Sequence, residues 1–195
     1  MAINSLSTGF RPGVCTSSTR PTAPYEGQFI YETDTDMLAI WNGTAWRYIA
    51  ATTPTNGTVL QIVQATYSAV IVSNSTTTMA DTNLTATITP KSSSSKILVT
   101  VHQTFSKTPG NKDNCVGARI VRDSTAIHTF AVAHGYTNST TVDAILVLSA
   151  MYLDSPATTS ATTYKTQFAN FVAAASVSAN TNNTPATITL MEISA

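Results

Sequence analysis

Three histidines are the first residues to consider for chemistry, because imidazole binds metals and exchanges protons near neutral pH. His128 and His134 flank a strand-like segment, and a spacing of six residues places both on one side of a strand. No Asp, Glu or Cys accompanies them, so the spacing is a weak metal signal. His102 lies opposite the apolar alternation of its own segment. We therefore expect ordinary surface or packed histidines, with no metal and no cofactor.

The carboxylates form one cluster and one separated pair. Glu32, Asp34 and Asp36 fall in a single turn. This turn lacks the glycine and the bidentate acidic residue of a calcium loop, so we expect it to be closed by local Asx hydrogen bonds. Asp143 and Asp154 stand at strand ends, where exposed solubilising roles are usual. A glycan depolymerase would need two such carboxylates facing a groove.

Sequence motifs of common enzymes are missing. The chain has no Gly-x-Ser-x-Gly elbow, no phosphate-binding Gly-rich loop and no His-Glu-x-x-His. Charged residues make up only 10% of the sequence, which leaves few titratable groups to bring together. We predict that the protein is not an enzyme, and a glycan depolymerase stays a remote alternative that depends on Asp143 and Asp154.

Aromatic residues are concentrated near the N-terminus. They could stack on sugar rings, but a small module needs its aromatics for its own packing and for contact with other subunits. We favour this second interpretation. The candidate assembly residues are Phe29, Tyr31, Trp41, Trp46 and Tyr48.

The composition excludes several classes of protein. The 195 residues include 36 threonines and 20 serines, but only 10 basic and 10 acidic side chains. A net charge of zero gives no electrostatic footprint for nucleic acid. A hydrophobic content of 43% with so little charge is far from the disordered regime. Because charge normally keeps surfaces apart, either the exposed surface is rich in hydroxyls or much of it is buried against partner chains.

Membrane insertion and secretion are not expected. The most apolar run, residues 144–153, is about half the length of a bilayer helix. The first five residues show no start of a secretory signal. Cys15 and Cys115 match no metal spacing, and they suit unpaired thiols in a reducing cytosol, although a single long-range disulfide stays open.

Residues 1–55 differ in composition and in the length of their apolar runs from the rest of the chain. After a proline-broken, extended opening, three short apolar runs at 28–32, 37–41 and 45–49 are separated by Asp-rich and Asn-Gly turns, which predicts a small β-meander. So few strand residues cannot form a core alone. This module must therefore pack on something, and copies of itself are a natural candidate. Residues 51–57 form a plausible linker.

Residues 58–195 form a series of strand-like runs with turns between them. Alternation is clear where Ile97, Val99 and Val101 share one face. About eight strands in about 140 residues predict an antiparallel β-sandwich, with a jelly roll favoured over a barrel. Residues 173–179 are interpreted as loop or edge strand. The candidate strands are 59–72, 79–89, 96–105, 115–122, 126–133, 141–153, 162–171 and 186–193.

Residues 15–50 also resemble a known module. The order Arg20-Pro21, Gly27-Gln28-Phe29-Ile30-Tyr31-Glu32-Thr33-Asp34-Thr35 and Trp41-Asn42-Gly43-Thr44-Ala45-Trp46 is similar to a short module of bacteriophage tail-fibre and other virion proteins. The stretches 80–90, 96–99 and 186–193 resemble, more loosely, the β-sandwich heads of phage appendages. The sequence has no long helical or repetitive shaft, so the resemblance implies a short appendage.

The resemblance implies an all-β structural protein of the virion, made in the cytoplasm of the host bacterium. It implies a homotrimer with a jelly-roll or TNF-like head. We expect residues 1–55 to dock it to other virion proteins of the tail or baseplate, and residues 58–195 to face a host surface glycan or receptor. The alternative is a capsid decoration or head-fibre protein. The resemblance transfers no catalytic residues.

Overall fold

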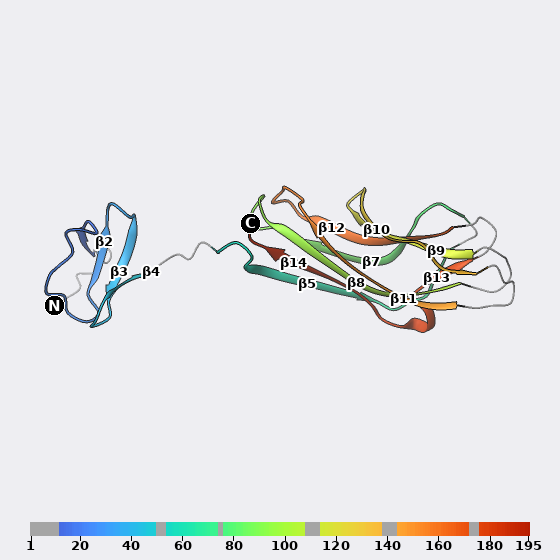
Figure 1. Ribbon diagram of the computed structural model, residues 1–195, viewed down its shortest axis with the longest axis horizontal. Coiled ribbons are helices and arrows are strands. Elements are labelled where there is room, and N and C mark those ends of the chain that lie inside the picture. Colours follow the sequence, from blue (N-terminus) through green and yellow to red (C-terminus); the bar gives the residue numbers. More distant parts are fainter. Residues whose placement is uncertain (1–11, 50–53, 74–75, 108–113, 138–143, 172–175) are drawn as a thin grey trace, which may run out of the picture. The chain divides into compact units, whose positions relative to one another are not determined.

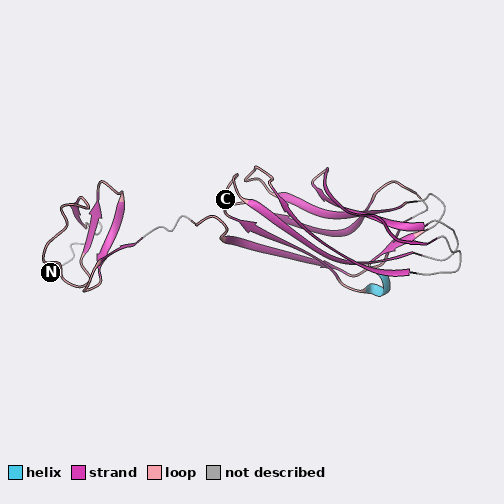
Figure 2. Cartoon of the chain, in the orientation of Figure 1, coloured by secondary structure: helices cyan, strands magenta, loops and turns pink. Residues whose placement is uncertain are grey.

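The computed structural model describes residues 12–49, 54–73, 76–107, 114–137, 144–171 and 176–195. The chain divides into two compact units, with the boundary between Thr53 and Pro54 (Figure 1). Strands make up nearly all of the regular structure, as Figure 2 shows. In the described ranges no helix has the length and apolar character that crossing a bilayer requires.

The first unit is a four-stranded sheet in the order β1-β2-β3-β4. The antiparallel meander β2–β3–β4 occupies the three predicted runs. An additional strand, β1, pairs in parallel with β2 and lies in the opening segment that the sequence indicated as irregular. The bounds are β1 Gly13–Cys15, β2 Phe29–Glu32, β3 Met37–Trp41 and β4 Trp46–Ile49.

The turn between β3 and β4 is an Asx turn. The side-chain carbonyl of Asn42 accepts hydrogen bonds from the backbone N–H of Thr44 at 3.1 Å and of Ala45 at 2.8 Å. Gly43 has a φ of 89°, a left-handed conformation that glycine adopts without strain. The last opposed pair is Trp41 and Trp46, so the loop has four residues and is longer than a two-residue Asn-Gly turn.

The second unit, hereafter the head, consists of two facing sheets. One has the order β10-β9-β12-β7, and the other has β5-β14-β8 with β11 on the free side of β8. The short strands β13 and β6 extend the second sheet beyond β14 and β5. The bounds are β5 Val59–Tyr67, β6 Ile71–Ser73, β7 Ala80–Ile88, β8 Lys96–Lys107, β9 Asn114–Arg122, β10 Thr125–Thr137, β11 Ala144–Asp154, β12 Thr162–Asn170, β13 Val177–Ala179 and β14 Ala186–Ile193.

The strand pairing is that of a jelly roll. If β5 with β6 and β13 with β14 are each counted as one interrupted strand, the head has eight strands in chain order. The first then pairs with the eighth, the second with the seventh, the third with the sixth and the fourth with the fifth. This is an antiparallel hairpin rolled into two sheets. The predicted all-β fold with an antiparallel sandwich is confirmed.

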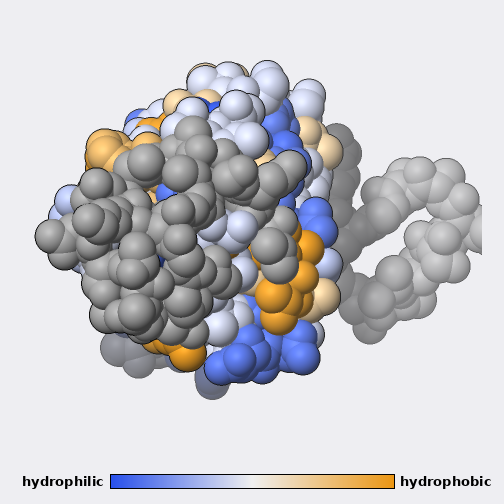
Figure 3. Space-filling view, turned by 90° about the vertical axis from the view of Figure 1, so that its right-hand side faces the viewer, coloured by the Kyte–Doolittle hydropathy of each residue, from blue (hydrophilic) through white to orange (hydrophobic). Residues whose placement is uncertain are grey.

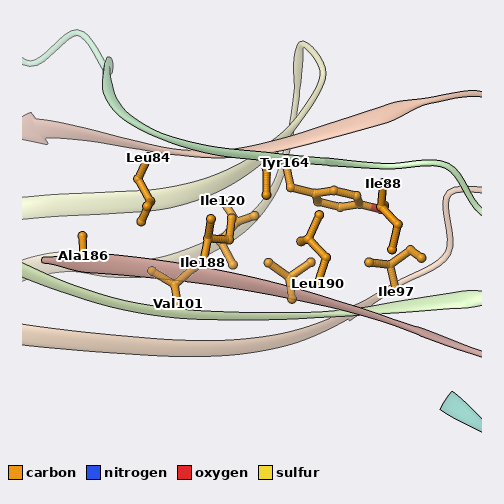
Figure 4. Close-up of a cluster of buried hydrophobic side chains, with 11 residues drawn as sticks. Leu84, Ile88, Ile97, Val101, Ile120, Tyr164, Ala186, Ile188 and Leu190 are labelled. Carbon is orange, nitrogen blue, oxygen red and sulfur yellow. The ribbon is translucent and has the colours of Figure 1, made fainter. Parts of the chain in front are cut away.

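The core lies between the sheets, where alternate residues of each strand meet. In Figure 4 the ring of Tyr164 lies next to Ile88 and Leu190, and Ile188 lies near Ile120. A second cluster, which includes Phe105 and Phe168, fills the rest of the interior. Period-two alternation of aliphatic and hydroxyl residues produces this arrangement, because successive side chains of a strand point to opposite faces.

A buried polar chain separates the two apolar clusters. Thr82 and Thr166 share a hydrogen bond, Thr166 donates to Gln103, and Gln103 donates to Asn180 at 2.9 Å. Asn180 also donates to the backbone carbonyl of Ala69 at 3.1 Å. All four linked side chains are buried. The chain connects both sheets and ends where β13 gives way to β14.

Two local predictions need correction. The part of residues 173–179 that the structure describes includes β13, which is neither a loop nor an edge strand, because it lies between β8 and β6. The predicted long strand at 59–72 is interrupted between β5 and β6. Cys15 and Cys115 are both free thiols, so no disulfide joins the two units.

Candidate functional site

The five candidate assembly residues are divided between the two faces of the N-terminal sheet. Trp41 and Trp46 are opposite each other on one face, and their rings meet edge to face at 5.6 Å and 60°. Tyr48 shares that face, since it is opposite the buried Ala39. Phe29 and Tyr31 alternate with the buried Ile30 and therefore lie on the other face. The structure thus brings three of the five aromatics together and separates the other two.

A buried carboxylate stabilises the face that carries the tryptophans. Glu32 is fully buried and receives hydrogen bonds from Arg20, from the hydroxyl of Tyr48 at 2.9 Å and from Thr35 at 3.2 Å. The guanidinium of Arg20 also lies over the Tyr48 ring, 5.6 Å from its centre. The hydrogen bond from Arg20 is the main cause of a lowered pKa of Glu32, although burial acts in the opposite direction.

The other two carboxylates of the acidic turn have separate partners. Asp34 accepts hydrogen bonds from the backbone N–H of Ser17 at 2.8 Å and from its hydroxyl, and these bonds lower its pKa. Asp36 adopts a left-handed φ of 56° and accepts from the Tyr31 hydroxyl. The turn is therefore held by long-range as well as local bonds. In the described segments no three His, Cys, Asp or Glu residues gather as a metal-binding group.

In the head, Asp154 links the two sheets. It is buried at the end of β11, where Arg122 of β9 donates to both of its oxygens at 2.9 and 2.8 Å. The hydroxyl of Tyr164 donates to it at 2.7 Å, and burial followed by this bond raises the pKa of Tyr164. The expectation of an exposed Asp154 is wrong, because the alternation of β11 turns this residue inward. Asp143 lies outside the described residues.

The three histidines have unrelated environments. His102 is exposed on β8 and its Nδ1 lies 3.2 Å from the Ser149 hydroxyl of β11. His128 stacks on Tyr152 with ring centres 4.8 Å apart. His134 is exposed.

The outer face of β11 carries exposed aliphatic side chains. Leu146, Leu148, Ala150 and Tyr152 of β11 pack toward the core. The residues between them point outward, and four of them are exposed hydrophobic side chains, with exposed fractions of 53–70%. We call these four the β11 stripe: Ile145, Val147, Met151 and Leu153.

The register of the strands extends this surface across the whole sheet. Leu153 of the stripe is opposite Leu98 of β8, Leu98 is opposite Met191 of β14, and Met191 is opposite Ile62 of β5. Ile62 is 59% exposed. One apolar row therefore crosses all four strands. The row beside it consists of Met151, Thr100, Thr189 and Gln64, and the next consists of Ser149, His102, Thr187 and Thr66.

The outer face of the opposite sheet is polar. Arg119 of β9 donates to the Gln167 carbonyl at 2.7 and 2.9 Å, and Gln167 donates to Asp81 of β7 at 2.7 Å. Lys165 completes the series with an ion pair to Asp81 at 2.7 Å. These charged side chains satisfy one another across three strands. The two outer faces of the head therefore differ in chemical character.

The polar face also has an apolar hollow of about 280 Å³. Its floor includes Gly117, where an added Cβ would meet the Met79 methyl at 3.4 Å. Val132 and Phe171, which are 64% and 53% exposed, form part of its wall. Figure 3 looks onto the head from the end away from the linker and shows hydrophobic groups at the surface beside hydrophilic ones.

Sequence reasoning missed the β11 stripe, although it identified residues 144–153 as the most apolar run. The signal was the same run interpreted as a strand: if a run that is apolar at every position but Ser149 forms one strand, about half of its aliphatic side chains lie on each face of the sheet. The N-terminal aromatics, in contrast, stand out by residue type alone.

No protein-family model matches this sequence, and neither does any curated protein. Solved structures that are similar include infectious bursal disease virus strain Gt, with 14% identity and a TM-score of 0.40, covering 81% of this chain and 44% of that one. The VP2 subviral particle of infectious bursal disease virus has 16% identity and a TM-score of 0.38, covering 90% of this chain and 46% of that one. The chain thus spans less than half the length of these solved chains.

Proposed function

We propose that this protein is a structural component of a bacteriophage virion: a short homotrimeric fibre or adhesin attached to the tail or baseplate. In this proposal the N-terminal unit docks to other virion proteins. The head is presented to a glycan or receptor on the host surface. The chain performs no catalysis, and its buried carboxylates serve to join strands.

The observation that carries the proposal is that the head has two distinct ends, with the linker joined to one of them. Gly57 and Thr58, at the end of the linker, exchange backbone hydrogen bonds of 2.8 and 2.9 Å with Ser194 near the C-terminus. The strand β8 begins at this end, with Lys96 opposite Ile193, and it finishes at the other end, with Lys107 opposite Ala144. Twelve strand residues, about 40 Å, separate the two ends. An appendage needs such an arrangement, because the end opposite the attachment is free to meet a surface.

One further feature supports a structural role. The motif of residues 15–50 resembles a module of virion proteins, and its Arg20 and Glu32 form the main polar contact of the unit. Binding of the host by a trimer can use avidity, since three weak contacts on each appendage strengthen binding without a deep pocket.

Gold-labelled antibodies against the full chain, applied to purified particles of the phage that encodes it, test the proposal. We expect label at the tail, and we expect the purified protein to inhibit adsorption of that phage to its host. Label spread over the head would replace the tail assignment by the capsid-decoration alternative. Particles without the protein would overturn the virion role altogether.

A glycan depolymerase is tested separately with Asp154→Asn. We expect that purified host capsule or lipopolysaccharide keeps its chain length when incubated with the wild-type protein. Cleavage by the wild type that Asp154→Asn abolishes would contradict a purely structural role. The variant's far-UV circular dichroism is the control for folding.

A further inference from the structure

We propose that the outer face of the sheet β5-β14-β8-β11 is the contact between copies of this chain, and that the β11 stripe faces the threefold axis. This inference rests on the proposed homotrimer and identifies the surface that holds it together. The partner is a second copy of the same chain, aligned in parallel. Five observations support it: the exposure of the stripe, the charge of the face, the contrast with the opposite face, the area, and the unpaired edge of the sheet.

The β11 stripe exposes four aliphatic side chains on one face of a single strand, with Ser149 between Val147 and Met151. Val147 is 57% exposed, Ile145 58%, Leu153 53% and Met151 70%. Single exposed aliphatics are common on protein surfaces, but contiguous apolar surfaces mark interaction sites. Ile62, which is in the same cross-strand row as Leu153, continues the surface to the far edge of the sheet.

The charge of the face identifies the partner. The outward residues of its four strands include one formally charged side chain, Lys96, which lies at the linker end and donates to Ser155. Around a threefold axis each side chain meets its own two copies, so an ionised group there would face like charge. Uncharged aliphatic side chains have no such repulsion. The net charge of zero for the whole chain fits association with itself.

The opposite face of the head shows what a solvent-facing surface of this protein looks like. Arg119, Gln167, Asp81 and Lys165 form a connected polar surface there. The same fold thus places a charged network on one outer face and the β11 stripe on the other. The difference is expected if the second face is buried in the assembly.

The face is large enough for a stable contact. At about 3.4 Å per residue β11 spans about 37 Å, and four strands about 4.8 Å apart cover about 19 Å, which gives on the order of 700 Å². Stable interfaces bury about 800 Å² on each partner. The area of this face is therefore close to the area that one partner buries in an ordinary subunit contact.

The edge of the sheet needs protection. In the part of the chain that the structure describes, β11 pairs with β8 on one side and with no strand on the other. Its 11 residues leave a long strand edge whose backbone pairs with no described strand, and such an edge is open to uncontrolled pairing. Packing of three copies around β11 covers both the stripe and this edge.

Mass measurement of full-length variants tests the interface. The wild type is expected at three times the 20.6 kDa of one chain in sedimentation equilibrium. Val147→Asp with Met151→Asp places charge at the axis, and we expect this variant at the mass of one chain with an unchanged far-UV spectrum. The matched control is Val132→Asp, which changes a similarly exposed side chain of β10 on the other sheet and should keep the trimer mass.

Cross-linking gives a second readout that does not depend on the folding of the charged variant. In a Cys15→Ser background, Met151→Cys with a short bismaleimide should yield covalent pairs of chains, and Val132→Cys should not. The interface is wrong if the charged variant stays trimeric, if only Val132→Cys cross-links, or if the wild type is monomeric. The proposed virion role has a separate test, because it fails when purified particles bind no gold-labelled antibody. A wrong interface and a wrong virion role can therefore be told apart.

Discussion

Gln103 and Thr166 are joined by a hydrogen bond of 2.9 Å across the middle of the head, from β8 of one sheet to β12 of the other. Gln103 is fully buried and also donates to Asn180 at 2.9 Å. Because this polar chain lies between two apolar clusters, a shift of one sheet along the other would break it. It therefore specifies how the two sheets are aligned.

Gln103→Ala should destabilise the head strongly. The substitution leaves the Asn180 carbonyl and the Thr166 hydroxyl buried without Gln103 as partner, and we expect a loss of about 3 kcal/mol in the free energy of unfolding. Denaturant unfolding followed by far-UV circular dichroism measures this loss. Thr129→Ala, at an exposed position of β10, should change the same quantity by no more than about 0.5 kcal/mol. Equal effects of the two changes would contradict the proposed alignment role.

Tyr164→Phe should reduce stability at neutral pH and less so at alkaline pH. The hydroxyl of Tyr164 donates to Asp154, and its pKa is raised in the folded state from 10.0. The stabilisation is complete below the unfolded pKa and is lost as the pH rises above it, because only the unfolded tyrosine ionises. We expect the gap between wild type and variant to narrow by about 1 kcal/mol between pH 8 and pH 11. Denaturant titrations at pH 8 and pH 11 measure the difference in unfolding free energy between wild type and variant. An equal difference at both pH values would contradict a raised pKa of Tyr164 in the folded state.

Acid should unfold the N-terminal unit through Glu32. Its pKa is lowered in the folded state, mainly by Arg20, so its stabilisation is present above the unfolded pKa of 4.5 and is lost as the pH falls through the lower, folded value. Both tryptophans of the chain lie in this unit, so their fluorescence reports on it alone. Glu32→Gln should destabilise the unit at pH 7 and reduce its acid dependence, and the lowered pKa of Asp34 should account for part of what remains. The exposed Glu26→Gln is the control, and it should reproduce the wild-type titration.

Gly135→Ala should cost more than the same change at another glycine with positive φ. Gly135 has a φ of 69°, and an added Cβ would overlap one methyl of Leu146 on the neighbouring β11. Gly57 has a φ of 88° and nothing within 4 Å of the added atom. Gly57→Ala therefore measures the cost of a side chain in the left-handed backbone conformation alone, about 1 kcal/mol. We expect Gly135→Ala to exceed it by about 1–3 kcal/mol in denaturant unfolding, as overpacking does. Similar losses would mean that Leu146 moves aside freely.

The sequence alone determined where most strands lie and which residues form the core. Where Leu84, Ala86 and Ile88 alternate with threonines, the strand is stable only with its aliphatic side buried. Eight runs of this kind therefore predicted two sheets packed on each other as a sandwich. The meander near the N-terminus followed in the same way from its turns and short runs. These are local properties, and local properties can be read from a sequence.

The tertiary structure decided everything that depends on pairing between distant strands. Every described residue from Ala144 to Leu153 except Ser149 is apolar or aromatic, so no alternation shows which half faces out, and only the register with β8 assigns Met151 to the surface. The inward turn of Asp154 and the parallel pairing of β1 depend in the same way on partners far along the chain. Composition indicated a β-rich chain with little charge; the fold decided that the aliphatic excess lies on one face of one sheet, because a residue's side of a sheet is fixed by its neighbours in space.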